Sequence, residues 1–268
     1  MKIKSPYLIK PHTKVRLAKI PSSDTGDYKS DEAAKAVLVK HRNQLQDLQE
    51  VFYANQSKAL LIVLQGMDTA GKDGTISHIF SGINPQGCDV AAFKVPTPLE
   101  IRHDFLWRVH AQVPPRGMIG IFNRSHYEDV LSPCVHKLIS SEVADRRLDD
   151  INEFESFLAD NHVLILKFYL HISRDEQTRR LKARLDDKDK QWKLSEADIH
   201  ERKFWPRYID AYDHILCATS RKHAPWFVIP SDHKWYRNIA ISTIIVDLMQ
   251  SLNLNYPKPT IDPSAIKL

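Results

Sequence analysis

The chain has 268 residues, a length that suits one large domain or two small ones. Hydrophobic residues make up 43 % and charged residues 26 %, which excludes collagen-like, disordered and membrane-embedded classes. The net charge of +5 points to an anionic partner, but the six basic residues before Asp24 account for all of it, and the rest of the chain is close to neutral. No stretch approaches the roughly 18 apolar residues of a membrane span, and the Met1 region lacks the apolar middle of a secretory signal. We therefore expect a cytoplasmic protein without a membrane partner.

The first predicted elements are a basic arm, a helix and a strand. The arm covers residues 1–30 and contains several prolines. Apolar side chains recur every three or four positions over residues 31–54, which predicts an amphipathic helix. Residues 59–65 (ALLIVLQ) form a continuous apolar run that ends at Gly66, as in a buried parallel strand.

Strand-like and helix-like segments then alternate to the end of the chain. Further short apolar runs cover 89–93, 118–122, 163–171 and 226–230, and helical patterns cover 99–113, 142–159 and 235–252. This alternation predicts an α/β fold of three layers, with a central five-stranded parallel sheet flanked by helices. We find no repeat and no linker, so residues 1–268 are predicted to form a single domain, in which the charged segment 174–220 forms a helical lid with its flanking helices.

Glycines cluster between the first predicted strand and the next helix. Five of the eight glycines fall between Gly66 and Gly87, and the sequence LQGMDTAGKDGT contains Gly66-x-x-x-x-Gly71-Lys72. Glycines in such a turn let backbone N–H groups surround a polyphosphate, and the lysine reaches the transferred phosphate. The strand before and the helix after favour this interpretation over a tight turn with an incidental lysine.

One position departs from the usual phosphate-loop pattern. Asp73 follows Lys72, where a Ser or Thr normally contacts Mg²⁺. We therefore expect carboxylates to hold the metal, with Asp68 inside the loop as the nearest candidate.

A second group of polar residues follows the predicted strand 118–122. The sequence FNRSHYEDV places Arg124 and the carboxylates Glu128 and Asp129 just past that strand. Ligands in open α/β sheets bind beyond the carboxyl ends of the strands, so Arg124 is predicted to contact phosphate, and Glu128 or Asp129 to bind a metal or to position the nucleophile. A helix cap with a solvated acidic first turn is the alternative.

The charged segment supplies a third group. Seven basic residues oppose three acidic ones between Arg179 and Lys193, and Arg180 and Arg184 share a helix face. This excess favours a lid that grips phosphate over a simple solvated face, and we expect the lid to be mobile without substrate because it has few apolar anchors. The cysteines and histidines show no metal-ligand spacing, and we interpret the three cysteines as free thiols.

Several linked motifs together resemble the polyphosphate kinase 2 family, whose members transfer a phosphoryl group between inorganic polyphosphate and a nucleotide. The resemblance covers nearly the whole chain and depends on GMDTAGKDGT, HDFLWRVH, FNRSHYEDV, LHISRDEQTRRLKARLDD, WKLSEADI and APWFVIPSDHKWYRN. It implies a P-loop kinase-like fold similar to that of thymidylate kinase, with a helical lid. Many members have Asp where this chain has Asn123, and this version looks like the subgroup that accepts both nucleoside mono- and diphosphates.

The resemblance and the motifs together give a set of predicted site residues. The predicted catalytic residues are Asp68, Lys72, Asp73, Arg124 and Glu128, and of these Asp68, Asp73 and Glu128 are the predicted Mg²⁺ ligands, with Mn²⁺ as the alternative ion. The predicted phosphate- and polyphosphate-binding residues are Gly66, Ala70, Gly71, Lys72, Gly74, Thr75, Arg124, Arg180, Arg184 and Lys193.

The predicted function is a reversible, polyphosphate-dependent phosphorylation of AMP or ADP by direct in-line transfer. Adenine nucleotides are the expected acceptors, guanine nucleotides are the alternative, and we expect a homo-oligomer that does not bind nucleic acid. Two other functions stay open: an ATP-dependent nucleoside monophosphate kinase, and a non-catalytic nucleotide-binding regulator.

Overall fold

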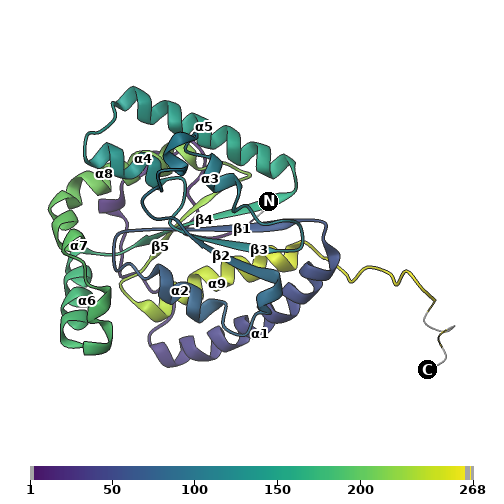
Figure 1. The fold of residues 1–268 in the computed structure, drawn as a ribbon. Coiled ribbons are helices and arrows are strands. Elements are labelled where there is room, and N and C mark those ends of the chain that lie inside the picture. Colours follow the sequence, from purple (N-terminus) through teal and green to yellow (C-terminus); the bar gives the residue numbers. More distant parts are fainter. Residues whose placement is uncertain (1–2, 263–265, 267–268) are drawn as a thin grey trace.

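The computed structural model describes residues 3–262 and residue 266 (Figure 1). Five parallel strands form one sheet in the order β2-β3-β1-β4-β5. Their bounds are β1 (Ala59–Gln65), β2 (Cys88–Ala92), β3 (Ile119–Asn123), β4 (Val163–His171) and β5 (Trp226–Pro230). The predicted five-stranded parallel sheet is confirmed, and only β2 and β3 differ from the predicted strands, by one residue each.

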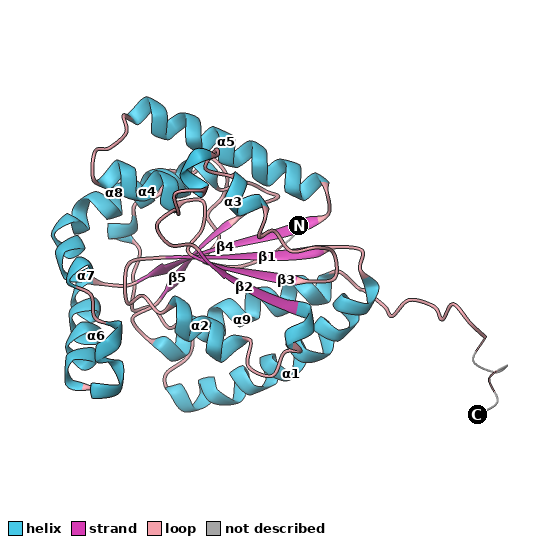
Figure 2. Cartoon of the chain, viewed as in Figure 1, coloured by secondary structure: helices cyan, strands magenta, loops and turns pink. Residues whose placement is uncertain are grey.

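Helices cover both faces of this sheet and complete three layers (Figures 1 and 2). One layer contains α1 (Asp31–Asn55), α2 (Lys72–Ile79) and α9 (Lys234–Ser251). The other contains α3 (Trp107–His110), α4 (Glu128–Val135), α5 (Ser141–Asp160) and α8 (Trp205–Thr219). The central strands β1 and β4 are buried along almost their whole length, as their apolar sequences require.

The helix predicted over residues 99–113 is wrong in its extent. The structure has a short 3₁₀ turn at Glu100–Arg102 and the four-residue α3, with extended backbone at His103 between them. Asp104 explains the break, because its Oδ1 accepts a hydrogen bond from the Leu106 N–H at 3.0 Å. Such a local side-chain bond stabilises a turn at the expense of the helix.

The predicted lid segment divides into two parts. Its first part contains α6 (Arg174–Asp186), a 3₁₀ stretch and α7 (Glu196–Glu201), which lie together at one end of the molecule (Figure 1). Its last part is α8, which buries Tyr212, Ile215 and Leu216 and packs against α4 and α5. Most of the buried apolar side chains of this segment therefore lie on α8, whereas α6 buries Leu181, and the lid itself stays a prediction.

The predicted basic arm lies along the sheet edge. Leu8 pairs with Phe227 in an antiparallel bridge, and the Val228 N–H donates to the Tyr7 carbonyl at 2.9 Å. Lys2, one of the arm's basic residues, lies outside the described residues. Along the described chain, no helix is long and apolar enough to cross a membrane.

Candidate active site

The glycine-rich loop connects β1 to α2, as its sequence predicts. Gly66 and Gly71 have φ values of 153° and 107°, in the region that favours glycine. A Cβ atom on Gly71 would lie 1.8 Å from Nη1 of Arg237, and one on Gly66 would lie 2.8 Å from the Leu170 carbonyl oxygen. Both glycines are therefore required by the packing around the loop as well as by its backbone conformation.

Lys72 is the first residue of α2 and points back over the loop. Its Nζ donates to the Gly66 carbonyl at 2.8 Å and lies 3.4 Å from the Met67 carbonyl. Burial lowers the pKa of Lys72, and repulsion from Arg124 lowers it further, while Asp68 is the first of the nearby carboxylates that oppose this shift. The buried ammonium group thus lies beside the loop carbonyls, where one arginine and three carboxylates affect its pKa.

Arg124 reaches the loop from the neighbouring strand, because β1 lies between β3 and β4 in the sheet. Its backbone adopts φ 63°, and its Nη2 donates to Oδ1 of Asp68 at 2.7 Å. A non-glycine residue in this conformation is uncommon. This contact places Arg124 beside the loop, and its predicted contact with phosphate stays a prediction.

The predicted carboxylates gather on the same side of the loop. Asp73 accepts a 2.7 Å hydrogen bond from Nδ2 of Asn123, and Glu128 lines a small cavity with Asp68 and Arg124. Burial raises the pKa of Glu128, and the positive charges of Arg124 and Lys72 oppose that rise. No group of three His, Cys, Asp or Glu side chains in the described part of the chain is arranged to hold a metal by itself.

The structure places Arg180 beneath the loop. Its Nη1 donates to the carbonyls of Thr69 and Ala70 at 2.9 and 3.0 Å, its Nη2 donates to the Ser231 carbonyl at 2.5 Å, and its Nε donates to Glu176. The guanidinium therefore holds protein oxygens in this conformation. The predicted phosphate contact of Arg180 stays a prediction, and it requires these bonds to break.

The other predicted binding residues lie along the loop and the lid. Ala70 and Thr75 are buried, and Gly74 lies in the first turn of α2. Arg184 is partly buried on α6, and Lys193 is exposed, with its Nζ 5.0 Å from the Trp192 ring centre. Arg184 and Lys193 thus belong to α6 and to the 3₁₀ stretch after it, and their predicted phosphate contacts stay predictions.

Two residues beside the loop were missed in the sequence analysis. Arg237 on α9 donates through Nη1 to the Ala70 carbonyl at 3.1 Å, and Gln177 on α6 donates to the Asp68 carbonyl at 2.9 Å. Burial, followed by repulsion from Arg180, lowers the pKa of Arg237. Arg237 lies in the quoted stretch APWFVIPSDHKWYRN, but its contact with a loop 167 residues away has no local sequence signal.

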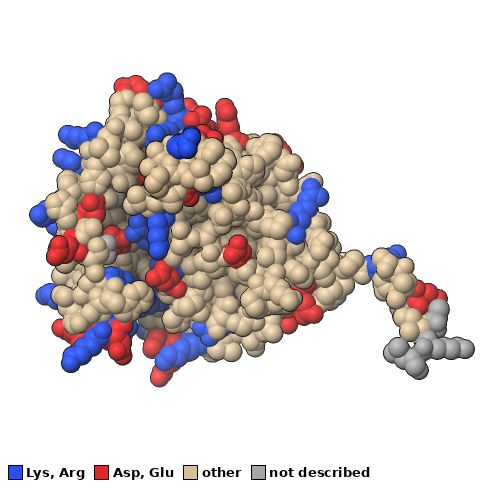
Figure 3. All heavy atoms as spheres, viewed as in Figure 1, with Lys and Arg blue, Asp and Glu red and all other residues tan. Residues whose placement is uncertain are grey.

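The surface around this site has a mixed charge. Lys, Arg, Asp and Glu gather on the side of the molecule that carries α6 and α7, and the side toward the C-terminal tail is mostly uncharged (Figure 3). Beside the loop, Arg124 pairs with Asp68 and Arg180 pairs with Glu176.

In this structure a glycine-rich loop connects a buried parallel strand to a helix, and an arginine from the next strand lies beside the loop. This arrangement is typical of the P-loop class of phosphoryl-transfer proteins. The family model of Polyphosphate kinase 2 (PPK2) matches residues 28–257. A relative from Meiothermus ruber, named "AMP/ADP-polyphosphate phosphotransferase", is 45 % identical over 254 residues, which cover 94 % of this chain and 95 % of the relative. The "ADP-polyphosphate phosphotransferase" of Rhodopseudomonas palustris is 42 % identical over 273 residues, which cover 97 % and 94 % of the two chains.

A solved structure gives the same result. The "Polyphosphate Kinase 2 from Arthrobacter aurescens TC1" superposes with a TM-score of 0.93 at 42 % identity and covers 99 % of this chain and 96 % of that one. The chain belongs to the polyphosphate kinase 2 family. The predictions of a P-loop kinase-like α/β fold and of a polyphosphate-dependent nucleotide kinase are confirmed at this level.

Proposed function

We propose that this chain transfers a phosphoryl group from inorganic polyphosphate to both AMP and ADP, reversibly and without a covalent enzyme intermediate. The observation that carries the proposal is the convergence of Lys72, Arg124 and the glycine-rich loop at the carboxyl ends of β1 and β3. Family membership supports polyphosphate as the donor, and the name of the Meiothermus ruber relative supports AMP and ADP as acceptors.

The loop and the start of α2 supply the phosphate cradle. Backbone N–H groups at a helix N-terminus attract anions, and the positive φ of Gly71 turns the chain into that helix. Arg180 and Arg237 hold carbonyl oxygens of Thr69 and Ala70 from behind. With these carbonyls fixed, the loop N–H groups stay oriented toward the substrate, so little reorganisation is needed when phosphate binds.

Lys72 and Arg124 neutralise the charge that develops during transfer. The Lys72 ammonium donates to the carbonyls of Gly66 and Met67 and has a third donor for a bridging phosphate oxygen. The Arg124 guanidinium is 42 % exposed, and its planar donors match two phosphate oxygens once it leaves Asp68. Positioning and electrostatics carry such a reaction, so no nucleophilic side chain is required.

The carboxylates fit a divalent cation of the hard, oxygen-preferring kind. Mg²⁺ is usually bound by one or two carboxylates together with substrate phosphates and waters, so a set of three protein ligands is unnecessary. Asp68, Asp73 and Glu128 all oppose the lowering of the Lys72 pKa, so their negative charges act at the lysine that is proposed to contact the transferred phosphate. Asp68 and Asp73 would hold Mg²⁺ or Mn²⁺, and the ion would supply charge neutralisation between donor and acceptor phosphates.

The remaining predictions about this chain are part of the proposal. Arg184 and Lys193 on the lid would contact the longer polymer, because they add positive charge on the α6 side of the loop. Guanine nucleotides are the alternative acceptors, a member of the family from Mycobacterium tuberculosis being named "GDP-polyphosphate phosphotransferase". A homo-oligomer in the cytoplasm stays a prediction.

A donor-exchange assay separates the proposed function from its rivals. Purified protein receives Mg²⁺ and long-chain polyphosphate with AMP or ADP in separate reactions that contain no ATP, and nucleotide products are resolved by chromatography. We expect ADP and then ATP to appear over many turnovers. An ATP-dependent kinase would form product only when ATP is the donor, and a non-catalytic regulator would bind nucleotide without turnover.

A further inference from the structure

The turn between β3 and α4 carries two residues of the candidate active site. Arg124 begins the turn with a positive φ of 63°, and Glu128 ends it as the first residue of α4. The three residues between them are Ser125, His126 and Tyr127, and all three are 0 % exposed. Their side chains therefore lie beneath the site, inside the protein, and their contacts hold the turn.

A buried ion pair lies beneath this turn. Lys167, in the middle of β4, donates through Nζ to Oε2 of Glu155 on α5 at 2.5 Å, and both side chains are at most 1 % exposed. The same Nζ donates to the Thr219 carbonyl at the end of α8 at 2.8 Å. The pair thus joins the sheet to two helices of one layer at a place that is shielded from solvent.

Tyr127 and His126 connect the turn to this pair. The Tyr127 hydroxyl donates to Oε1 of Glu155 at 2.9 Å and accepts from Nζ of Lys167 at 2.8 Å, and Nε2 of His126 lies 3.2 Å from the same Glu155 oxygen. Burial raises the pKa of Glu155, but the charge of Lys167 and the hydrogen bond from His126 lower it by more, so the carboxylate is ionised. An ionised carboxylate only accepts hydrogen bonds, so Nε2 of His126 is a donor.

The network contributes more to the geometry of the turn than to stability. A buried ion pair stabilises a protein little compared with apolar side chains of the same volume, because desolvation offsets the attraction of the charges. Hydrogen bonds tolerate only a narrow range of distances and angles, so a turn displaced by about 1 Å would break the bonds of both the hydroxyl and the imidazole. The network therefore favours one position of the turn over its neighbours.

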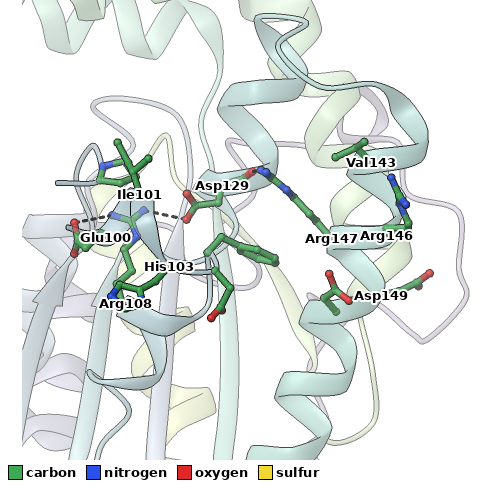
Figure 4. Close-up of a pocket in the computed structure, with 13 residues that line it drawn as sticks. Glu100, Ile101, His103, Arg108, Asp129, Val143, Arg146, Arg147 and Asp149 are labelled. Atoms are coloured by element: carbon green, nitrogen blue, oxygen red, sulfur yellow. Dashed lines mark hydrogen bonds and ion pairs between the residues drawn. The ribbon is translucent and has the colours of Figure 1, made fainter. Parts of the chain in front are cut away.

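The first turn of α4 is held from its outer side as well. Arg108 and Arg147 reach Asp129 from two sides (Figure 4). Nη2 of Arg108 donates to Oδ2 of Asp129 at 2.9 Å, and Nη1 of Arg147 donates to the Asp129 carbonyl at 2.5 Å. Glu128 thus lies between two residues, Tyr127 and Asp129, that are each fixed by hydrogen bonds from other elements.

We propose that His126 and Tyr127 are positioning residues for the phosphoryl transfer. They hold the turn on the buried Glu155, so that the Arg124 guanidinium stays beside the glycine-rich loop, although both lie beneath the site. The proposal rests on the proposed function, since it explains how one group of that site is placed. A misplacement of about 1 Å can cost about a hundredfold in rate, so the loss of these contacts should appear in kcat.

The first test removes one hydroxyl. Tyr127→Phe keeps the ring, and the control Ser242→Ala removes a buried hydroxyl, bonded to His41 and to the Ile239 carbonyl, from α9 in the opposite helix layer. In the assay with polyphosphate and AMP, Tyr127→Phe should lower kcat by at least about tenfold and change both KM values by less than about threefold. The control should keep kcat within about twofold of the wild type.

Hydrogen exchange measured by NMR reports on the turn without turnover. The backbone N–H groups of Arg124 and Glu128 each donate to a carbonyl at 3.0 Å, so their exchange reports opening of the turn. In Tyr127→Phe both amides should exchange at least about tenfold faster relative to the amide of Ile62 in β1, which reports global unfolding. In Ser242→Ala this ratio should equal that of the wild type.

A second pair of variants tests the imidazole and its rescue. His126→Leu removes the donor to Glu155, whereas His126→Gln keeps an N–H donor on a side chain of similar reach. His126→Leu should lower kcat by at least about tenfold, and His126→Gln should recover most of that loss.

Several results would overturn the proposal: wild-type kcat in Tyr127→Phe, an unchanged exchange ratio in that variant, an equal loss of kcat in Ser242→Ala, or no recovery by His126→Gln. Faster exchange of the turn in Tyr127→Phe, in a protein that is inactive with polyphosphate, would support the holding of the turn and contradict the proposed function. Wild-type activity with polyphosphate and an unchanged turn in Tyr127→Phe would do the reverse.

Discussion

Replacing Lys72 with methionine tests the role of its charge at nearly constant side-chain volume. The ammonium is buried and holds the Gly66 carbonyl at 2.8 Å, so the structure places it within the loop that is proposed to bind the donor. Methionine keeps the apolar stem of the lysine and removes only the charge and the donors. The effect on the reaction should therefore reflect electrostatics at the phosphate.

The expected size of the effect follows from the position of the charge. Loss of one preorganised donor at a developing negative charge typically lowers kcat by about 10²–10³, equal to about 2.7–4 kcal/mol. The fold should tolerate the change, because burial already disfavours the ammonium, as its lowered pKa shows. We expect the free energy of unfolding to change by about 1 kcal/mol, the usual contribution of one hydrogen bond.

The assay measures kcat, KM for AMP and AMP binding by calorimetry for the wild type, Lys72→Met and the control Lys222→Met. Lys222 is exposed before β5, at the opposite edge of the sheet from the loop. Lys72→Met should lose kcat while AMP affinity changes by less than about threefold, and the control should resemble the wild type. Equal losses of kcat and AMP affinity, or an unchanged kcat, would contradict a role for the Lys72 charge in phosphoryl transfer.

Three further predictions follow from the site and its surroundings. In urea titrations, Gly71→Ala should lower the free energy of unfolding by at least about 2 kcal/mol, because the added Cβ would overlap the buried Arg237 guanidinium. Gly74→Ala, whose Cβ would lie 3.4 Å from Arg237, should instead raise the free energy of unfolding by a few tenths of a kcal/mol. Lys167→Met should lower the free energy of unfolding by about 3–5 kcal/mol, since it removes the ammonium partner of the buried Glu155 carboxylate, and adding Glu155→Gln should recover part of the loss; recovery of none would argue against the ion pair. Burial lowers the pKa of Lys167 to about 8 in the folded protein. Below pH 8 the lysine is protonated in both the folded and the unfolded protein, and between pH 8 and about 10.4 it is protonated to a greater extent in the unfolded protein. The wild type should therefore gain stability relative to the double variant as the pH rises through that window, and a relative loss would contradict the assignment. Asp73→Asn should raise the Mg²⁺ concentration for half-maximal activity by about tenfold, and an unchanged Mg²⁺ titration would remove it from the metal site.

The sequence was sufficient for the sheet and for the core of the candidate site. Strands such as β1 and β4 are continuous apolar runs, and the alternation with helices determined their parallel arrangement. Arg124 could be placed beside the loop because the carboxyl ends of neighbouring parallel strands meet at one edge. The same rule could not give the order of strands, but β1 proved to be next to β3.

Contacts between segments far apart in the chain could not be predicted from the sequence. Arg180 had the pattern of a basic lid residue, and only the structure shows its guanidinium bonded to carbonyls 110 and 111 positions away. Lys167 lies within an apolar strand pattern, and its pairing with Glu155 at 2.5 Å depends on how α5 packs on β4. The break at Asp104 was missed because one side-chain hydrogen bond outweighs a helical apolar pattern locally.

The most direct test of the account follows the transferred phosphoryl group itself by ³¹P NMR, with long-chain polyphosphate, AMP and Mg²⁺ and without ATP. Each phosphoryl group gained by AMP or ADP should be matched by one phosphoryl group lost from polyphosphate, with no orthophosphate released and no phosphorylated protein after rapid acid and alkaline quenching, and Lys72→Met should slow both changes equally. Formation of a phosphoprotein, or ADP that appears only after ATP is added, would contradict direct transfer from polyphosphate at this loop.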